Sequence, residues 1–373
     1  MIRNDVIALT RKLIAIDTTG SRRTEEDAAR YLGKVLSADG YTIRVDEYEP
    51  GRPTLIAEKG VTEATAPLVF SGHLDTVPLG ATPWTKQPFA GEIHDGRLYG
   101  RGASDMKGGV AAMLCAAHRA FATATPQAGI RFIITAGEEP GCFGALHLRQ
   151  TGFDCGSARA VIICEPTSNI PYLGHKGALF LKLSTSGKTA HSSMPELGDN
   201  AIYKAARAIT RIENFQFNVE RHPLHGLPTI NVGLISGGAN LNSVPDHAEF
   251  TVDIRSTPMI DHTEIKTRLQ SELGSDITIE TLVDLSAVSS SPDDPFCRLV
   301  DDVCGFSNAV SPRRSRSLSY MTDGAVLQPL YSGVPTIILG PGEPSQAHRT
   351  DEYCLTEKLH EAVHLYETII QTF

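Results

Sequence analysis

Four short apolar runs limit the possible folds of this chain more than any other feature of its sequence. They read PLVFSGH, IRFIITA, AVIICE and PTIILG, and within each run the apolar residues are largely consecutive. Strands that are apolar on both faces are typical of a mostly parallel sheet covered by helices. The small-residue helix pattern DMKGGVAAMLCAAHRAF, between the first two runs, suits close packing on such a sheet. The sequence therefore predicts an α/β fold with a mostly parallel, helix-covered sheet.

Residues 176–285 follow a different pattern. GALFLKLSTSG is strand-like and AEFTVDIRS alternates apolar with polar residues, as strands do when only one face packs on helices. Residues 200–213 and 261–273 read as helices. Since 373 residues suffice for two domains, we expect 176–285 to form a smaller α+β domain. It would be inserted into a larger catalytic domain made of residues 1–175 and 286–373.

The composition narrows the range of partners and compartments. A net charge of −9 at pH 7 argues against a nucleic-acid partner, because phosphate binding requires a basic surface. No apolar run approaches the ~20 residues of a membrane helix, and the N-terminal residues lack the apolar core of a signal peptide. The seven cysteines are scattered and form no CxxC pair, which is typical of reduced thiols. We expect a cytoplasmic protein with no nucleic-acid or membrane partner.

Residues that can bind metal follow the apolar runs. The carboxyl ends of parallel strands meet at one edge of a sheet, where ligands gather. The loop GRGASDMKGG brings a further carboxylate to the start of a helix. The residues expected at this edge are His73, Asp75, Asp105, Glu138, Glu139, Glu165 and His348.

This combination of side chains indicates a metal site. Crowded carboxylates raise one another's pKa values, and divalent cations relieve their repulsion. Imidazoles together with carboxylates suit zinc better than magnesium, which prefers oxygen ligands. Two histidines and three carboxylates are too many for one catalytic zinc, but they suit two metals that share a carboxylate, about 3.5–4 Å apart. Asp75 need not be a ligand, since it can accept the proton on the second nitrogen of His73 and fix its tautomer.

Each of these features has a plainer interpretation when taken alone. An H-x-D sequence is a weak motif, and the adjacent acids Glu138 and Glu139 could form a solvated turn. Agreement at four strand ends favours the metal site. Complete motifs for a phosphate loop, a dinucleotide fold or a serine nucleophile are missing from the sequence, which argues against ATPases, dehydrogenases and serine hydrolases.

Seven motifs, in order along nearly the whole chain, resemble one family of zinc-dependent metallopeptidases and deacylases. This family includes acetylornithine deacetylase, succinyl-diaminopimelate desuccinylase, aminoacylase and carboxypeptidase G. TDGAVL and the last of the seven motifs look most like acetylornithine deacetylase, whereas the second also suits the desuccinylase and carboxypeptidase G. The motifs are SGHLDTVP, GRGASDMKGG, AGEEPG, CEPT, GKTAHSSMPELGDNAI, NSVPDHAEFTVDIR and GPGEPSQAHRTDEY.

The resemblance implies roles for the residues at the sheet edge. His73 and Glu165 would hold one zinc ion and Glu139 and His348 the other, with Asp105 bridging them. Asp75 would orient His73, and Glu138 would act as general base and then as general acid. The peptide bond from Asp105 to Met106 would be cis. Cobalt and manganese are alternatives to zinc.

The resemblance also implies substrate contacts from the inserted domain. His191, Asn242 and Arg255 match substrate-binding positions of the family, with Arg255 as a clamp for a carboxylate. In dimeric relatives the smaller domains pair and the matching histidine reaches the partner's site. We therefore expect a homodimer in which His191 stabilises the oxyanion, in cis or in trans.

The expected function is that of a dizinc amidohydrolase that removes the acyl group from an N-acyl amino acid, as acetylornithine deacetylase does in amino-acid biosynthesis. A succinyl-diaminopimelate desuccinylase, or a carboxypeptidase or dipeptidase acting on short peptides, are alternatives that use the same site. A metal-dependent binding protein without catalysis is a further alternative. The presence of Glu138 argues against it, since binding alone needs no general base.

Overall fold

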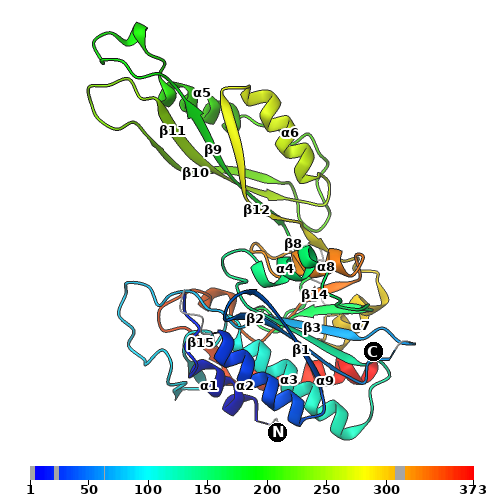
Figure 1. Ribbon diagram of the computed structural model, residues 1–373. Helices are drawn as coiled ribbons and strands as arrows, with labels where there is room; N and C mark the ends of the chain where they lie inside the picture. The colour runs from blue at the N-terminus through cyan, green and yellow to red at the C-terminus, as the bar shows by residue number, and fades with distance from the viewer. Residues whose placement is uncertain (1–4, 21–24, 63, 307–315) are drawn as a thin grey trace. The chain divides into compact units, whose positions relative to one another are not determined.

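The computed structural model describes residues 5–20, 25–62, 64–306 and 316–373 (Figure 1). These residues form two compact units. The larger unit contains the described residues of Met1–Gly174, Ser289–Arg316 and Thr322–Phe373. The smaller unit contains His175–Val288 together with Ser317–Met321. The short segment Ser317–Met321 is a difference from the expected division, because it comes from the C-terminal part of the chain.

The larger unit is built on a six-stranded sheet with the strand order β1-β2-β6-β3-β7-β14. The strands β6, β3, β7 and β14 run parallel, and β2 and β1 extend the sheet in antiparallel fashion. Every residue of β3 and β6 is buried, which explains why these runs carry no alternation. The predicted α/β fold with a mostly parallel sheet is confirmed. The strands are β1 (Thr42–Glu49), β2 (Arg52–Lys59), β3 (Leu68–His73), β6 (Ile130–Thr135), β7 (Ala160–Ile163) and β14 (Thr336–Ile338).

Helices cover both faces of this sheet. Figure 1 shows α1, α2, α3 and α9 on one face and α4 and α8 on the other. A three-stranded sheet of β15, β5 and β4 completes the unit, together with the short helices α7 and η3. The helices are α1 (Val6–Ile14), α2 (Glu25–Ala38), α3 (Lys107–Thr123), α4 (Phe143–Thr151), α7 (Pro295–Val303), α8 (Gly324–Leu330), α9 (Thr356–Thr372) and the 3-10 helix η3 (Pro344–Gln346). The short strands are β4 (Ile93–His94), β5 (Arg97–Tyr99) and β15 (Tyr353–Leu355).

The contact between α3 and the end of β7 determines where two parts of the candidate site lie. At Gly109 a Cβ atom would lie 2.1 Å from the carbonyl oxygen of Cys164, so only glycine permits this approach. Asp105 lies just before α3, and Glu165 directly follows Cys164. Close packing of the helix on the sheet therefore brings these two carboxylates together.

The smaller unit is a four-stranded antiparallel sheet, in the order β10-β11-β9-β12, with two helices. Buried and less buried residues alternate along β9 and β11, because one face packs on α5 and α6. Both expected helices are present, and Asn200 and Asp261 cap them by accepting hydrogen bonds from backbone N–H groups. The elements are β9 (Gly177–Ser186), β10 (Thr229–Gly237), β11 (His247–Ser256), β12 (Ile277–Leu285), α5 (Ala201–Glu213), α6 (His262–Leu273) and the 3-10 helix η1 (Pro195–Leu197).

The chain passes between the units at the short strands β8 (Gly174–His175) and β13 (Val288–Ser289). Within the described ranges, no helix is both long and apolar enough to cross a membrane. None of the seven cysteines forms a disulfide.

Candidate metal centre

Three parallel strands and one helix start of the larger unit deliver all the candidate ligands except His348, which lies in the loop between η3 and β15. His73 is the last residue of β3, Glu138 and Glu139 follow β6, and Glu165 follows β7. Because β6, β3 and β7 are parallel neighbours, these residues leave the sheet at the same edge. Asp105 lies at the same edge, two residues before the first residue of α3.

The first group of side chains contains His73, Asp105 and Glu165. The Nε2 atom of His73 lies 3.2 Å from Oδ1 of Asp105 and 3.7 Å from Oε1 of Glu165. One candidate ligand atom of each residue lies within 4.8 Å of those of the other two, and all three residues are buried. These donors, one imidazole and two carboxylates, are of the types that zinc binds.

The second group shares Asp105 with the first. The Nε2 atom of His348 lies 2.9 Å from Oε2 of Glu139 and 3.4 Å from Oδ2 of Asp105. Asp105 therefore directs one carboxylate oxygen to each of the two histidines, which is the arrangement that a bridging carboxylate requires. Oε1 of Glu139 is buried and has no hydrogen-bond partner among the described residues. An atom of this kind fits a metal ligand, and the residues present fit two divalent ions.

The electrostatics of the two groups indicate an excess of negative charge. Burial raises the pKa of Glu165 well above its ordinary value, although His73 opposes the shift. Burial by itself would lower the pKa of His73, but the charge of Glu165 and the hydrogen bond with Asp105 outweigh it and raise that pKa. Hydrogen bonds with Asp105 and Glu139 raise the pKa of His348 to about 10. Groups that hold protons so strongly are suited to hold metal ions in their place.

Asp75 contacts His73 through its backbone more closely than through its carboxylate. The Nδ1 atom of His73 lies 2.9 Å from the backbone carbonyl oxygen of Asp75, whereas the nearest carboxylate oxygen is 3.7 Å away. The carboxylate is occupied by other donors, since its Oδ1 accepts from the N–H of Glu138 (3.1 Å) and its Oδ2 from the N–H of Glu139 (3.0 Å). The backbone carbonyl thus fixes the His73 tautomer with the proton on Nδ1, which leaves Nε2 directed at Asp105 and Glu165.

Glu138 lies beside the two groups but belongs to neither. Its Oε1 atom lies 3.6 Å from Sγ of Cys142, and a carboxylate oxygen of Asp323 lies within 4.8 Å of both residues' candidate ligand atoms. Burial raises the pKa of Glu138 well above its ordinary value, against the effect of His73. Oδ2 of Asp323 accepts a hydrogen bond of 2.5 Å from the Thr135 hydroxyl, and burial raises its pKa to about 6.

Sequence reasoning missed Cys142 and Asp323 as neighbours of Glu138. For Cys142, its spacing of four residues from Glu138 across a Gly-containing turn was the available indication. Asp323 lies in TDGAVL, a segment that contributed only to the resemblance.

Glu352 holds the loop that carries Asp105, and it too was missed. Its carboxylate accepts hydrogen bonds from the backbone N–H groups of Gly102 (2.9 Å), Ser104 (2.8 Å) and Asp105 (3.0 Å). The Arg101 guanidinium donates a further bond of 2.7 Å. Burial raises the pKa of Glu352 to about 7, although Arg101 opposes the shift. The loop is therefore tied to a single buried side chain.

The Asp105–Met106 peptide bond is cis, as the family resemblance implied.

The three residues expected to contact substrate all lie in the smaller unit. His191 and Asn242 are neighbours there, because Ser192 N–H donates to the Asn242 carbonyl at 3.0 Å. Arg255 lies near the end of β11, away from this pair by most of the length of the strand. Its Nε atom lies 2.9 Å from Oδ1 of Asp253. The smaller unit thus brings His191 and Asn242 together but does not bring Arg255 to them.

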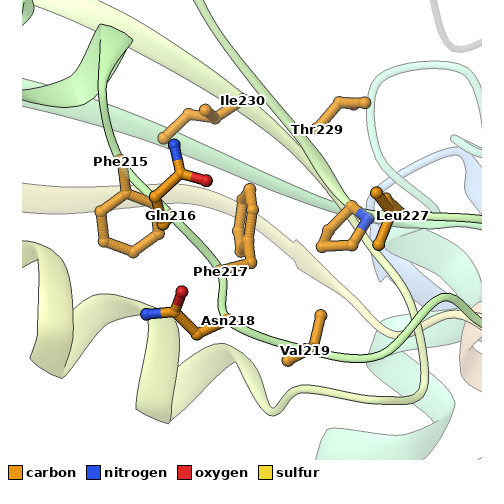
Figure 2. A pocket seen from close by; sticks show the side chains of 9 residues that line it. Phe215, Gln216, Phe217, Asn218, Val219, Leu227, Thr229 and Ile230 are labelled. Carbon is orange, nitrogen blue, oxygen red and sulfur yellow. The ribbon is translucent and has the colours of Figure 1, made fainter.

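A pocket of about 400 Å³ lies in the smaller unit (Figure 2). Its wall comes from two stretches of chain, residues 215–219 and 227–230, with the Phe215 and Phe217 rings prominent among the side chains. No carboxylate, imidazole or thiol lines it, so it offers no group for acid–base or metal chemistry. The chemistry of the described residues is concentrated in the larger unit.

Comparison with known proteins agrees with this geometry. The sequence profile of peptidase family M20/M25/M40 matches residues 69–372. A probable succinyl-diaminopimelate desuccinylase of Staphylococcus epidermidis is 29% identical, over 99% of this chain and 98% of its own. An acetylornithine deacetylase of Myxococcus xanthus is 32% identical, over 93% of this chain and 92% of its own.

Solved structures share the fold. The M20 family metallo-carboxypeptidase Sso-CP2 of Sulfolobus solfataricus aligns with a TM-score of 0.78 at 19% identity, over 98% of each chain. The Bacillus subtilis YXEP protein, described as a dinuclear metal-binding peptidase of the M20 family, aligns with a TM-score of 0.70 at 16% identity, over 98% of this chain and 97% of its own.

Proposed function

The chain belongs to peptidase family M20/M25/M40, and from this membership we propose that it is a dizinc amidohydrolase that releases the acyl group from an N-acyl amino acid. It is a hydrolase of amide bonds, as the curated relatives are. One observation carries the dinuclear part of the proposal: Asp105 directs its two carboxylate oxygens to two different histidines. His73 and Glu165 would hold one ion and Glu139 and His348 the other, with Asp105 between them.

The chain's own residues account for the proton transfers. Zinc, when bound, supplies Lewis-acid polarisation of the amide carbonyl and lowers the pKa of water. Glu138, fixed by the hydrogen bond from its N–H to Asp75, takes a proton from the attacking water. The same carboxyl group then gives a proton to the departing amine. Its burial, which raises its pKa, suits a group that must hold a proton between the two steps.

Recognition of the substrate is proposed for the smaller unit. Arg255 would bind a substrate carboxylate, a role for which its planar guanidinium is suited. Asp253 and the Phe180 ring, whose centroid lies 4.9 Å from the guanidinium carbon, hold the group in place. Asn242 would supply a polar contact, and His191 a hydrogen bond to the oxyanion.

We also propose that the protein is a homodimer formed by the smaller units. Several apolar side chains of this unit are exposed, and β10 is an edge strand of its sheet. Leu234 and Ile235 of β10 are 71% and 57% exposed, and Tyr203 of α5 is 66% exposed. Burial of such a surface favours association.

A substrate screen tests the proposed function. The zinc-loaded protein should hydrolyse N-acetyl amino acids faster than N-succinyl amino acids, and both faster than dipeptides. Metal analysis after zinc loading should give about two ions per chain. A preference for N-succinyl substrates would favour the desuccinylase alternative, which the Staphylococcus epidermidis relative supports. A preference for dipeptides would favour a peptidase, as the Sulfolobus solfataricus structure suggests. Failure to hydrolyse any of the three classes would contradict the proposal.

A further inference from the structure

A third group of side chains that could hold a metal ion lies in the larger unit, and one of its members, Glu138, is adjacent in sequence to the candidate ligand Glu139. Glu138, Cys142 and Asp323 each place a ligand-type atom within 4.8 Å of those of the other two. Their exposed fractions are 6%, 0% and 2%, so the group is shielded from bulk water. It shares no residue with the other two groups, and it alone contains a thiol.

The hydrogen bonding of this group is incomplete. Two carboxylates face one thiol, whose single proton can be donated to only one acceptor at a time. The Sγ atom lies 3.6 Å from Oε1 of Glu138, and the thiol is also within hydrogen-bonding reach of the Asp323 carboxylate. Thr135 satisfies Oδ2 of Asp323, but Oδ1 of Asp323 is buried and has no hydrogen-bond partner in the described part of the chain. A cation at the group would satisfy this oxygen and offset the repulsion of the carboxylates.

The spacing of the atoms suits a tetrahedral metal ion. An ion about 2.0 Å from a carboxylate oxygen and about 2.3 Å from a thiolate sulfur holds these two atoms about 3.5 Å apart. The Glu138–Cys142 separation of 3.6 Å is close to this value. A sulfur ligand among oxygen ligands favours zinc and softer ions such as cadmium over magnesium or calcium.

We propose that Cys142, Glu138 and Asp323 form a third, inhibitory site for a thiophilic divalent cation. On binding, the Cys142 S–H bond breaks, a sulfur–metal bond forms, and the proton leaves to solvent. Glu138 becomes a ligand and loses the lone pair with which it would accept a proton from water. This consequence for turnover rests on the proposed function, whereas the binding itself does not.

Cadmium provides a direct test of binding. The protein is first loaded with two zinc ions per chain, freed of excess zinc and then titrated with Cd²⁺, while the ultraviolet absorption of cadmium–thiolate bonds is recorded. Neither of the other two groups contains a thiol, so exchange of zinc for cadmium there adds no such absorption. In the native protein the band should be complete when about one Cd²⁺ ion per chain has bound in addition to the Cd²⁺ ions that replace zinc.

Variants assign the band to the proposed site. Cys142→Ala should abolish it, and Cys142→Ser, which keeps the size of the side chain, should do the same. Asp323→Asn should weaken the affinity by about 10–100-fold. Cys115→Ala is the matched control, since it removes an equally buried thiol from the interior of α3 and should leave the band unchanged. A band that persists in both Cys142 variants, or no band in the native protein, overturns the proposal.

Inhibition is measured separately. Excess Zn²⁺ should reduce the turnover of the native protein, and the same excess should reduce that of Cys142→Ala at least about tenfold less, relative to each variant's own maximum. A thiolate band in a protein without amidohydrolase activity would preserve the site and refute the proposed function. Amidohydrolase activity without a thiolate band would support the proposed function and refute the third metal site.

Discussion

The carboxylate of Asp75 accepts a hydrogen bond from the backbone N–H of Glu138, with 3.1 Å between Oδ1 and the nitrogen. Its other oxygen accepts from the next N–H, that of Glu139, at 3.0 Å. One side chain at the end of β3 therefore fixes the segment after β6 that carries both acids. The Nδ1 atom of His73, in contrast, lies closer to the backbone carbonyl oxygen of Asp75 (2.9 Å) than to its carboxylate (3.7 Å).

The different contacts of the Asp75 carboxylate and the Asp75 backbone carbonyl predict the result of Asp75→Asn. The amide group would direct an N–H toward one of the two backbone donors, which should displace Glu138 and lower kcat about 10–100-fold. Zinc affinity should fall as well, because Oδ2 of Asp75 holds the N–H of Glu139, a proposed ligand, whereas the His73 ring should stay in place because its hydrogen bond is to the backbone. Metal analysis and turnover on the same sample check both parts. Unchanged turnover of the zinc-loaded fraction would show that the Asp75 carboxylate does not position Glu138.

The adjacent acids Glu138 and Glu139 should respond differently to the same substitution. Glu138→Gln should keep its metal and lose about 10²–10⁴-fold in rate, the usual contribution of a general base. Glu139→Gln should instead lose metal affinity, because Oε2 of Glu139 faces His348 at 2.9 Å. Metal titration of each variant followed by assay at saturating zinc separates the two effects. Near-native turnover of Glu138→Gln would remove it from the proposed mechanism.

Much of the architecture of the larger unit was predictable because its information is local. Consecutive apolar residues define the buried strands, and the polar residues that follow them reach the same edge because the strands are parallel. The placement of His73, Glu139 and Glu165 at one edge of the sheet follows from this rule alone.

The relations that the sequence did not reveal depend on packing between distant segments. Asp323 bonds Thr135, 188 positions earlier in the chain, and nothing local to either residue indicates the contact. The carboxylate of Asp75 was expected to face His73, two residues away, but its oxygens are taken by donors 63 and 64 positions later. The hydrogen-bond partners of a side chain depend on which donors and acceptors the folded chain brings near it.

Glu352→Gln should weaken metal binding, although Glu352 is not itself a proposed metal ligand. The carboxylate accepts hydrogen bonds from the N–H groups of Gly102, Ser104 and Asp105. In the variant, the NH₂ of the amide would face some of these N–H groups, so the Asp105 loop would lose its support. We expect zinc affinity to fall about 10–100-fold, as for other residues that position ligands. Glu357→Gln, at an exposed position in the first turn of α9, is the matched control. Equal zinc affinity in both variants would contradict the role of Glu352.

Asp284 should make the stability of the smaller unit depend on pH. A hydrogen bond with His262 and another with Lys266 lower its pKa to about 2, against burial, from an ordinary value of 3.8. Because the folded pKa is the lower one, the stabilisation is present above about pH 4 and is lost as the pH falls toward 2. Native protein should therefore be more stable than Asp284→Asn at pH 5, and the difference should shrink between about pH 4 and 2. Urea denaturation at each pH measures it, and a constant difference would contradict the assignment.

His191 belongs to the smaller unit, whereas every proposed metal ligand and Glu138 belong to the larger unit. In the proposed homodimer, the smaller unit of each subunit would place His191 at the metal centre of the other subunit. There His191 would donate a hydrogen bond to the oxyanion. Loss of one such donor costs about 10²–10³-fold, so His191→Ala should be slow but fully metallated. Mixing this variant with Glu138→Gln should restore activity, because one site of each mixed dimer keeps both residues. Random pairing makes mixed dimers about half of the population, which gives about a quarter of the native activity. If native mass spectrometry shows subunit exchange while the activity stays at the level of the separate variants, His191 does not act in trans.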